Sequence, residues 1–306
     1  MRILVVGAGA IGGYFGGRLL ASGADVTFLV RPRRAEELAR DGLVIKSPHG
    51  DVTLPKPPTV QAQDLRTTFD VVLLSCKAYD LDDAIKSFAP AVGPQTAIIP
   101  MLNGMSHLDV LDRKFGRERV LGGQCAIAAT LDAQRHVAQL SPMQSLGFGE
   151  RDGKLSDRVR AIADIFAHGN FGSQASENIL QDMWEKWTLL ATLASSTCLM
   201  RAAIGKILEA PGGREFILGV RDEISNIAAA ADHKPRAPFI ERITGILTTE
   251  GSTFTASMFR DIVAGAPIEA DHIIGDLIVR ADAANIAVPR LRTVYTHLKT
   301  YEAQRG

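Results

Sequence analysis

The first thirteen residues, MRILVVGAGAIGG (Met1–Gly13), decide the fold of the N-terminal half. The apolar run Ile3–Val6 predicts a strand that is covered on both faces, because such strands have no polar side to show to water. The glycines that follow open a predicted helix over Ala10–Ala21. A lone GxGxxG pattern is weak evidence, but one that joins a buried strand to a helix is typical of dinucleotide binding.

The glycine loop therefore predicts a site for the pyrophosphate of a dinucleotide. The first glycine would permit the tight turn, the second would let the backbone approach the phosphates, and the third would let helix and strand lie close. The N–H groups that begin the helix would hold the anion. A tight turn without a ligand is the alternative. The expected contact residues are Gly7, Ala8, Gly9, Ala10, Ile11 and Gly12.

Strand and helix signals alternate through the rest of the first half. Further buried strands are expected at Val26–Val30, Phe69–Ser75, Thr96–Ile99 and Val120–Ala126, with helices at Arg33–Arg40, Asp82–Phe88 and His107–Phe115. This alternation predicts an α/β domain, a Rossmann-type doubly wound parallel sheet. The segment Leu43–Leu54 departs from the pattern and is expected to be a short hairpin or an edge insertion.

The second half has apolar spacing typical of helices and predicts an all-α domain. Its helices are expected at Asn178–Cys198, Phe216–Ala231, Ile240–Thr248, Ile268–Ala284 and Arg292–Ala303, with proline and glycine breaks between them. We therefore expect an NADP-binding domain over residues 1–175. A helical domain that carries substrate and catalytic residues would follow over 176–306.

Composition excludes several classes of protein. The 306 residues contain 34 Lys and Arg and 34 Asp and Glu, so a neutral chain without a basic tract is a poor candidate for binding nucleic acid or membranes. The 46% hydrophobic content excludes disorder. The three cysteines form no CxxC pair, which argues against a disulfide framework or a zinc site. With no signal peptide or membrane span in the sequence, a cytoplasmic protein is expected, and a homodimer is left open.

The end of the second predicted strand bears on the choice of cofactor. Where an NAD site would carry an acid for the ribose, the chain reads Val30-Arg31-Pro32-Arg33-Arg34. A guanidinium suits the 2′-phosphate of NADPH, so Arg31 favours NADPH over NADH. A solvated basic turn is the alternative.

The sequence resembles the ketopantoate reductase family (2-dehydropantoate 2-reductase) over essentially its whole length. The resemblance rests on the N-terminal stretch, the Lys of SCKAYD, the LNGM motif, WEKW and the block SMFRDIVAGAPIEADHIIG. It implies reduction of a 2-oxo acid by NADPH, with Lys186 as proton donor. Further site residues follow from the resemblance alone. Lys77, Asn103, Ala128 and Glu269 would lie at the cofactor, and Asn103, Lys186 and Ser257 would bind substrate.

Departures from the family pattern concern the substrate pocket. The family places Asn one turn and two turns after the lysine and again in a later loop, where this chain has Leu190, Ala194 and Ile204. Two alternatives to ketopantoate reduction therefore stay open: a reductase of a more apolar 2-oxo acid, and a sensor that binds NADP(H) without turnover. His272 is an alternative acid, and its Glu-x-x-His spacing from Glu269 is also a weak metal pattern; no metal is expected.

Overall fold

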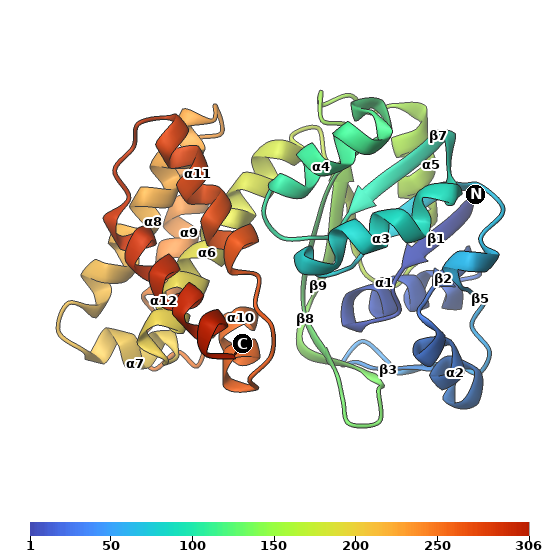
Figure 1. Cartoon of the computed structure of the whole chain (residues 1–306), viewed down its shortest axis with the longest axis horizontal. Coiled ribbons are helices and arrows are strands. Elements are labelled where there is room, and N and C mark those ends of the chain that lie inside the picture. The colour runs from blue at the N-terminus through green and yellow to red at the C-terminus, as the bar shows by residue number, and fades with distance from the viewer. Residues whose placement is uncertain (306) are drawn as a thin grey trace. The chain divides into compact units, whose positions relative to one another are not determined.

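The computed structural model describes residues 1–305 and divides the chain into two compact units. The first unit comprises Met1–Leu102 and His107–Ile179, and the second comprises Asn103–Ser106 and the chain from Leu180 onward (Figure 1). The short segment Asn103–Ser106 therefore belongs to the helical unit, although the sequence places it within the α/β half.

A parallel sheet forms the base of the first unit. Its strands lie in the order β5-β2-β1-β6-β7 and are all parallel. The bounds are β1 (Arg2–Val6), β2 (Asp25–Leu29), β5 (Thr59–Val60), β6 (Phe69–Leu74) and β7 (Val92–Pro100). The strand order reverses between β1 and β6, and open α/β sheets bind ligands at the carboxyl ends of strands at such a switch point. The predicted doubly wound parallel sheet is confirmed.

A second, mixed sheet was only partly predicted. It runs β10-β9-β3-β4, with β8 antiparallel to β9. Its strands are β3 (Leu43–Lys46), β4 (Val52–Leu54), β8 (Gly122–Leu131), β9 (Val137–Gly149) and β10 (Gly172–Ala175). The expected hairpin at Leu43–Leu54 is confirmed as β3 and β4. The expectation that Val120–Ala126 continues the parallel sheet is wrong: only Val120 makes a parallel bridge to Ile98, and β8 pairs with β9 instead.

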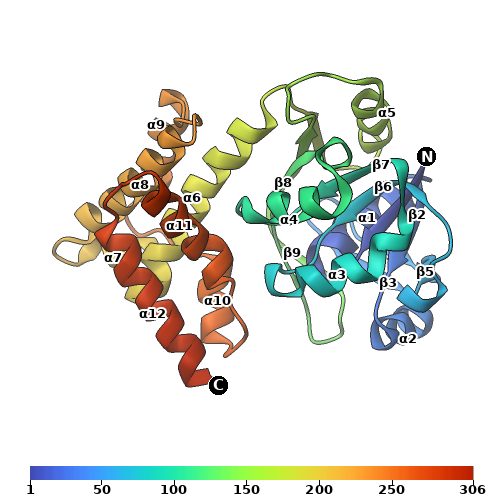
Figure 2. The same ribbon diagram turned by 45° about the horizontal axis from the view of Figure 1, so that its top comes forward.

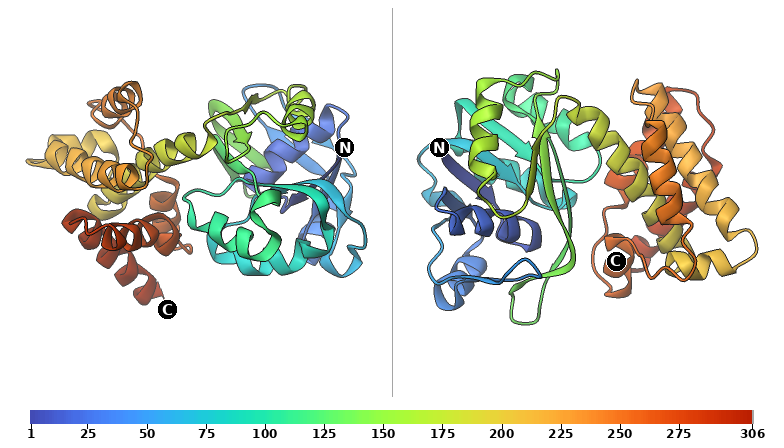
Figure 3. Two further views of the ribbon diagram at one scale, coloured as in Figure 1. Left: turned by 90° about the horizontal axis from the view of Figure 1, so that it is seen from above. Right: turned by 180° about the vertical axis from the view of Figure 1, so that it is seen from behind.

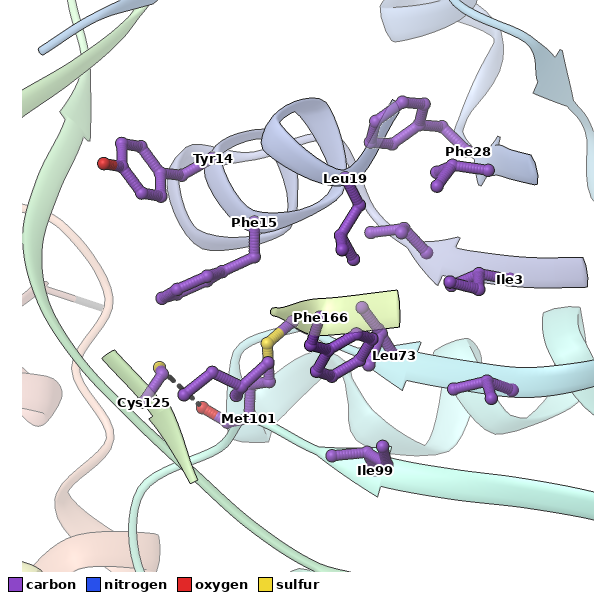
Figure 4. Packing of buried hydrophobic residues seen from close by; sticks show 14 of the residues in the cluster. Ile3, Tyr14, Phe15, Leu19, Phe28, Leu73, Ile99, Met101, Cys125 and Phe166 are labelled. Carbon is purple, nitrogen blue, oxygen red and sulfur yellow. Dashed lines mark hydrogen bonds between the residues drawn. The ribbon is translucent and has the colours of Figure 1, made fainter. Parts of the chain in front are cut away.

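Alternate residues of the parallel strands face opposite sides of the sheet. Ile3, Val5, Val71 and Leu73 belong to a core that also includes the second sheet and helices α1 (Ala10–Ala21) and α5 (Asp157–Phe166). Figure 4 shows Phe15 and Leu19 of α1 pointing toward the sheet residues of this core. Other helices of the unit are α2 (Pro32–Asp41), α3 (Leu81–Phe88) and α4 (Ser106–Phe115). The close fit of α1 fixes the glycine loop that precedes it.

Among the described residues, the second unit contains helices and no strand (Figure 2), as the apolar spacing predicts. Within it, α8 contacts α7, α11 and α12, and the helix bundle is seen from two further sides in Figure 3. The bounds are α6 (Ile179–Met200), α7 (Ile204–Glu209), α8 (Gly213–Ala230), α9 (Ala237–Leu247), α10 (Ser257–Val263), α11 (Asp276–Ala283) and α12 (Pro289–Arg305). No helix among the described residues is long and apolar enough to cross a bilayer.

The predicted helix Ile268–Ala284 is wrong at its start. Ile268 and Glu269 precede the helix, and its first turn is a π-helical turn, η5 (Asp271–Gly275), that leads into α11. π-Helical turns insert an extra residue per turn and are frequent at functional sites. Apolar spacing does not reveal such a turn, because the buried residues Ile273, Ile274, Leu277 and Ile278 keep the spacing of an ordinary helix.

Candidate active site

The glycine loop joins β1 to α1 with the geometry that the sequence predicts. Gly7 has a φ of +95°, which favours glycine, and its N–H donates to the Leu29 carbonyl at 2.9 Å. A Cβ added at Gly12 would lie 2.1 Å from the Gly7 carbonyl oxygen and 2.3 Å from Ser75 Oγ. The first and third glycines are therefore required by the fold itself.

The middle glycine has no such explanation within the protein. A Cβ added at Gly9 would meet nothing within 4 Å in the described part of the chain, and its backbone is extended, which any residue can adopt. Gly9 is the N-cap of α1, and as a glycine it offers no side-chain oxygen to the first N–H groups of the helix. These features fit a dinucleotide, whose pyrophosphate needs open space against bare backbone and a helix N-terminus.

The side chains of Ser75 and Arg34 hold this loop in place, a role that the sequence did not predict. Ser75 Oγ donates to the Val6 carbonyl at 2.8 Å, and Arg34 Nε donates to the Ala8 carbonyl at 3.0 Å. Arg34 is also paired with Glu37 at 3.0 Å, and its side chain is only 11% exposed. The alternative of a solvated basic turn is therefore wrong for Arg34, which has a structural role.

Arg31 differs from the other two arginines. Its side chain is 75% exposed at the carboxyl end of β2, and its Nη2 lies 2.8 Å from Asp80 Oδ1. The hydrogen bond and the charge of Asp80 raise the pKa of Arg31 above its usual value. Arg33 is also exposed, but it pairs with Glu37 on its own helix at 3.2 Å. Arg31 is thus the guanidinium that a phosphate could reach by displacing a surface carboxylate.

Of the four further residues expected at the cofactor, Lys77 and Ala128 lie in the first unit, whereas Asn103 and Glu269 lie in the second. Lys77 comes just after β6, and its carbonyl accepts a bond from the Asp80 N–H at 3.0 Å, so the lysine and the partner of Arg31 share one turn. Ala128 lies half-buried in β8, where the register with β9 shifts between Ile127 and Ala129. Irregularities of this kind often re-aim a strand beside a site.

In the second unit, Lys186 lies on α6 between two buried tryptophans. Trp184 and Trp187 are 2% and 1% exposed, and the Nζ atom of Lys186 is itself inaccessible to solvent. Trp187 Nε1 donates to the Ile273 carbonyl at 3.1 Å, which ties α6 to the π-helical turn η5. Arg280 of α11 lies over both indole rings, at 5.5 and 5.8 Å from their centroids. The lysine therefore lies on a stretch of α6 whose neighbouring side chains contact η5 and α11.

Glu185, the residue before Lys186, connects α6 to Arg236, which directly precedes α9. Glu185 is buried and accepts bonds from the Arg236 backbone N–H at 2.9 Å and from its guanidinium at 2.8 and 2.6 Å. Burial alone would raise the pKa of Glu185, but the bonds from Arg236 and Gln181 outweigh it and lower the pKa. A buried carboxylate that is this well paired acts as an anchor rather than as an acid.

Ser257 begins α10 and is exposed, and the segment before it is fixed by three hydrogen bonds. The N–H groups of Ile204 and Gly205 donate to the carbonyls of Phe254 and Ser252, and the Ala256 N–H donates to Thr197 Oγ1 at 3.3 Å. Thr197 lies on α6, eleven positions and about three turns after Lys186, on the same face. The helix that carries Lys186, α6, therefore helps to fix the position at which α10 begins with Ser257.

Asn103 lies in the second unit with Lys186, Ser257 and Glu269. His272 Nε2 contacts the Asn103 carbonyl at 2.5 Å, and His272 Nδ1 contacts Ser106 Oγ at 2.9 Å. Because both ring nitrogens are engaged, the geometry does not support His272 as the alternative acid. No group of His, Cys, Asp and Glu side chains within residues 1–305 could hold a metal ion.

Comparisons with known proteins match both the α/β half and the helical half of the chain. The family described as ketopantoate reductase PanE/ApbA matches residues 3–153, and its C-terminal counterpart matches residues 178–302. The chain belongs to the ketopantoate reductase PanE/ApbA family. It is 37% identical over 306 residues, the whole of both chains, to the Bacillus subtilis (strain 168) protein named uncharacterized oxidoreductase YkpB. It is 26% identical to a 2-dehydropantoate 2-reductase of Halobacterium salinarum, covering 96% of each chain.

Solved structures show the same fold. The crystal structure of 2-dehydropantoate 2-reductase from Methylococcus capsulatus matches with a TM-score of 0.88 and 27% identity, covering 100% of this chain and 98% of that one. D-mandelate dehydrogenase, solved with NADH and anilino(oxo)acetate, matches with a TM-score of 0.87 over 100% and 99% of the two chains. At 19% identity the latter likeness concerns the fold alone. The family is one of oxidoreductases.

Proposed function

We propose that this protein reduces a 2-oxo acid to the 2-hydroxy acid with NADPH. The observation that carries the proposal is the solvent-inaccessible Nζ of Lys186, held in one unit with Asn103, Ser257 and Glu269. The glycine loop of the first unit, with its unexplained Gly9, supports the dinucleotide. The 2-dehydropantoate 2-reductases that the chain resembles give the reaction class.

The chain's own residues would supply the charge and the proton. NADPH, when bound, supplies the hydride for the carbonyl carbon. The C=O double bond then becomes a single bond, and its electron pair moves to oxygen, where negative charge develops. Lys186 Nζ would stabilise that charge and pass a proton to the oxygen, which completes the hydroxyl group. Burial of the Nζ atom strengthens the interaction, because water screens the charge of a buried ammonium group less.

The preference for NADPH rests on residues rather than on the fold. The D-mandelate dehydrogenase structure contains NADH, so this architecture by itself does not decide between the two nucleotides. Arg31 is exposed just beyond β2 and is paired with a surface carboxylate, that of Asp80. A 2′-phosphate carries more charge than Asp80 and would form charge-assisted bonds to the same guanidinium.

By resemblance the substrate is ketopantoate, but the helical unit favours a more apolar 2-oxo acid. Leu190 and Ala194 offer no side-chain hydrogen bond on the lysine face of α6, and Ile204 is fully buried. The nearby hydroxyl of Thr197 donates to the Leu193 carbonyl at 2.7 Å and accepts from Ala256. A substrate hydroxyl left without a partner in a closed site costs about 1–3 kcal/mol, or about 5- to 150-fold in rate.

Oxidation of NADPH against a panel of 2-oxo acids tests the proposal. The panel should include ketopantoate and acids of similar size with branched aliphatic or aromatic side chains. We expect turnover with at least one acid, and faster turnover with an apolar one than with ketopantoate. Tight NADPH binding without turnover on any acid would contradict the proposal and would favour the sensor.

A further inference from the structure

Three contacts converge on His272, which none of the reaction steps above uses. Its Nε2 lies 2.5 Å from the Asn103 carbonyl oxygen and its Nδ1 lies 2.9 Å from Ser106 Oγ. Between these two residues, Gly104 packs directly on the ring. A Cβ added there would lie 3.2 Å from both Cδ2 and Nε2 of His272. The ring therefore touches the segment Asn103–Ser106 at its first, second and last residues.

The hydrogen bonds determine the state of the imidazole. A carbonyl oxygen can only accept, so Nε2 carries the proton that it donates to Asn103. Nδ1 of the neutral ring then accepts from the Ser106 hydroxyl. Burial lowers the pKa of His272, while the charges of Glu269 and Asp276 and the bond to Asn103 oppose that shift. The neutral ring uses both nitrogens to hold backbone and side chain of one short segment.

The local backbone is adapted to this contact from both sides. Gly104 has a φ of +78°, and a Cβ would also lie 3.1 Å from the His272 carbonyl oxygen, so glycine lets the two segments approach. His272 is the second residue of the π-helical turn η5, which begins directly after Ala270, and it follows Glu269 by three residues. Two motifs far apart in the sequence, LNGM and EADHIIG, are thus joined through one side chain.

We propose that His272 is a positioning residue that clamps Asn103–Ser106 onto the helical unit and so orients Asn103 for the reaction. This inference rests on the proposed function for its kinetic consequence, because Asn103 matters to catalysis only if a 2-oxo acid is reduced. The clamp itself is a property of the fold. It explains why this four-residue segment packs with the helical unit rather than with the sheet from which it emerges.

Three variants separate the parts of the clamp. H272F keeps an aromatic ring over Gly104 but removes both hydrogen bonds. H272Q keeps an N–H donor, because the side chain of glutamine is long enough to reach the Asn103 carbonyl. S106A removes only the partner of Nδ1 and is the matched control. If H272F does not fold, H272N replaces it, because the shorter amide loses the bond to Asn103.

Two readouts are needed: hydrogen exchange of a peptide spanning residues 101–107, and kcat with the best 2-oxo acid of the panel. We expect H272F to speed exchange in this peptide and to lower kcat about 10- to 100-fold, since misplacement by about 1 Å costs on that order. H272Q and S106A should stay within about threefold of wild type in kcat. The melting temperatures of the folded variants show whether a loss reflects general unfolding instead.

Several outcomes would overturn the proposal. Unchanged exchange in H272F shows that His272 does not hold the segment. Faster exchange with unchanged kcat shows that the clamp does not orient Asn103 for catalysis. An equal loss of kcat in H272F and H272Q shows that the imidazole acts as an acid rather than through the clamp. If wild type reduces no 2-oxo acid, the proposed function fails, and the exchange measurement alone decides whether the clamp exists.

Discussion

Replacing Arg31 with alanine should weaken the binding of NADPH but not that of NADH. A charge-assisted hydrogen bond contributes about 1.5–3 kcal/mol when it is protected from water. Arg31 is 75% exposed and gives up its 2.8 Å pair with Asp80 when a phosphate arrives, so only part of that free energy is gained. We therefore expect R31A to raise the Kd of NADPH about 5- to 10-fold, which corresponds to about 1–1.4 kcal/mol.

Substitution of Asp80, the partner of Arg31, should change the Kd of NADPH in the opposite direction. In D80N, Arg31 no longer exchanges one carboxylate for the phosphate, and a negative charge near the phosphate is removed. An exposed ion pair contributes about 0.2–1 kcal/mol, so the Kd of NADPH should fall about 1.4- to fivefold. R33A is the matched control, because Arg33 is 87% exposed and pairs with Glu37 instead. Its effect should be within about twofold.

Fluorescence titration of both reduced nucleotides into each variant measures these changes. The difference between NADPH and NADH should shrink at high salt, because the contact is exposed and screened. Equal losses for the two nucleotides in R31A would refute the reasoning, since they would place Arg31 at a part of the dinucleotide common to both. An R33A effect as large as that of R31A would point to general surface charge.

Three further predictions concern specificity, stability and reactivity. L190N combined with A194N should raise kcat/KM for ketopantoate relative to an apolar 2-oxo acid by about 5- to 150-fold, since the added amides can pair with its hydroxyl; an unchanged ratio in the substrate panel would contradict the apolar assignment. Because the pKa of Glu185 is lowered in the folded state, its ionised form stabilises the protein above the usual Glu pKa of about 4.3, and that stabilisation is lost as pH falls through the lowered value. E185Q should therefore lower the free energy of unfolding by about 1–3 kcal/mol in urea at pH 7, with a difference that narrows below about pH 4. Burial raises the pKa of Cys198 to about 12, so at pH 8 a thiol reagent followed by mass spectrometry should label the more exposed Cys76 and leave Cys198 unmodified.

Much of the first unit could be predicted from sequence, because its signals are local. A buried apolar run followed by glycines at fixed spacing defines β1, the loop and α1 within about twenty residues. Strand pairing is different, since partners distant in the chain decide it. Val137–Gly149 contains Pro142 and two glycines and does not read as a strand, so the true partner of β8 was missed.

Side-chain roles show the same division between local and distant signals. The exposed Arg31 and the buried Arg34 lie three residues apart, and only the structure shows that Arg34 bonds to the Ala8 carbonyl while Arg31 stays accessible. The contact of His272 with Asn103 joins residues 169 positions apart. Spacing could identify His272 as a candidate acid, but it could not show that both ring nitrogens are already engaged.

The central claim is that Lys186 supplies the proton and the positive charge for reduction of a 2-oxo acid. The most direct measurement is the single-turnover rate of NADPH oxidation by wild type and K186A with the best acid of the panel, alongside the Kd of NADPH for each. We predict a rate about 10²- to 10⁴-fold lower in K186A with the Kd within about threefold, because the lysine acts on the carbonyl oxygen rather than on the nucleotide. A K186A rate above a tenth of the wild-type rate would contradict the claim and leave Lys186 a structural role in α6.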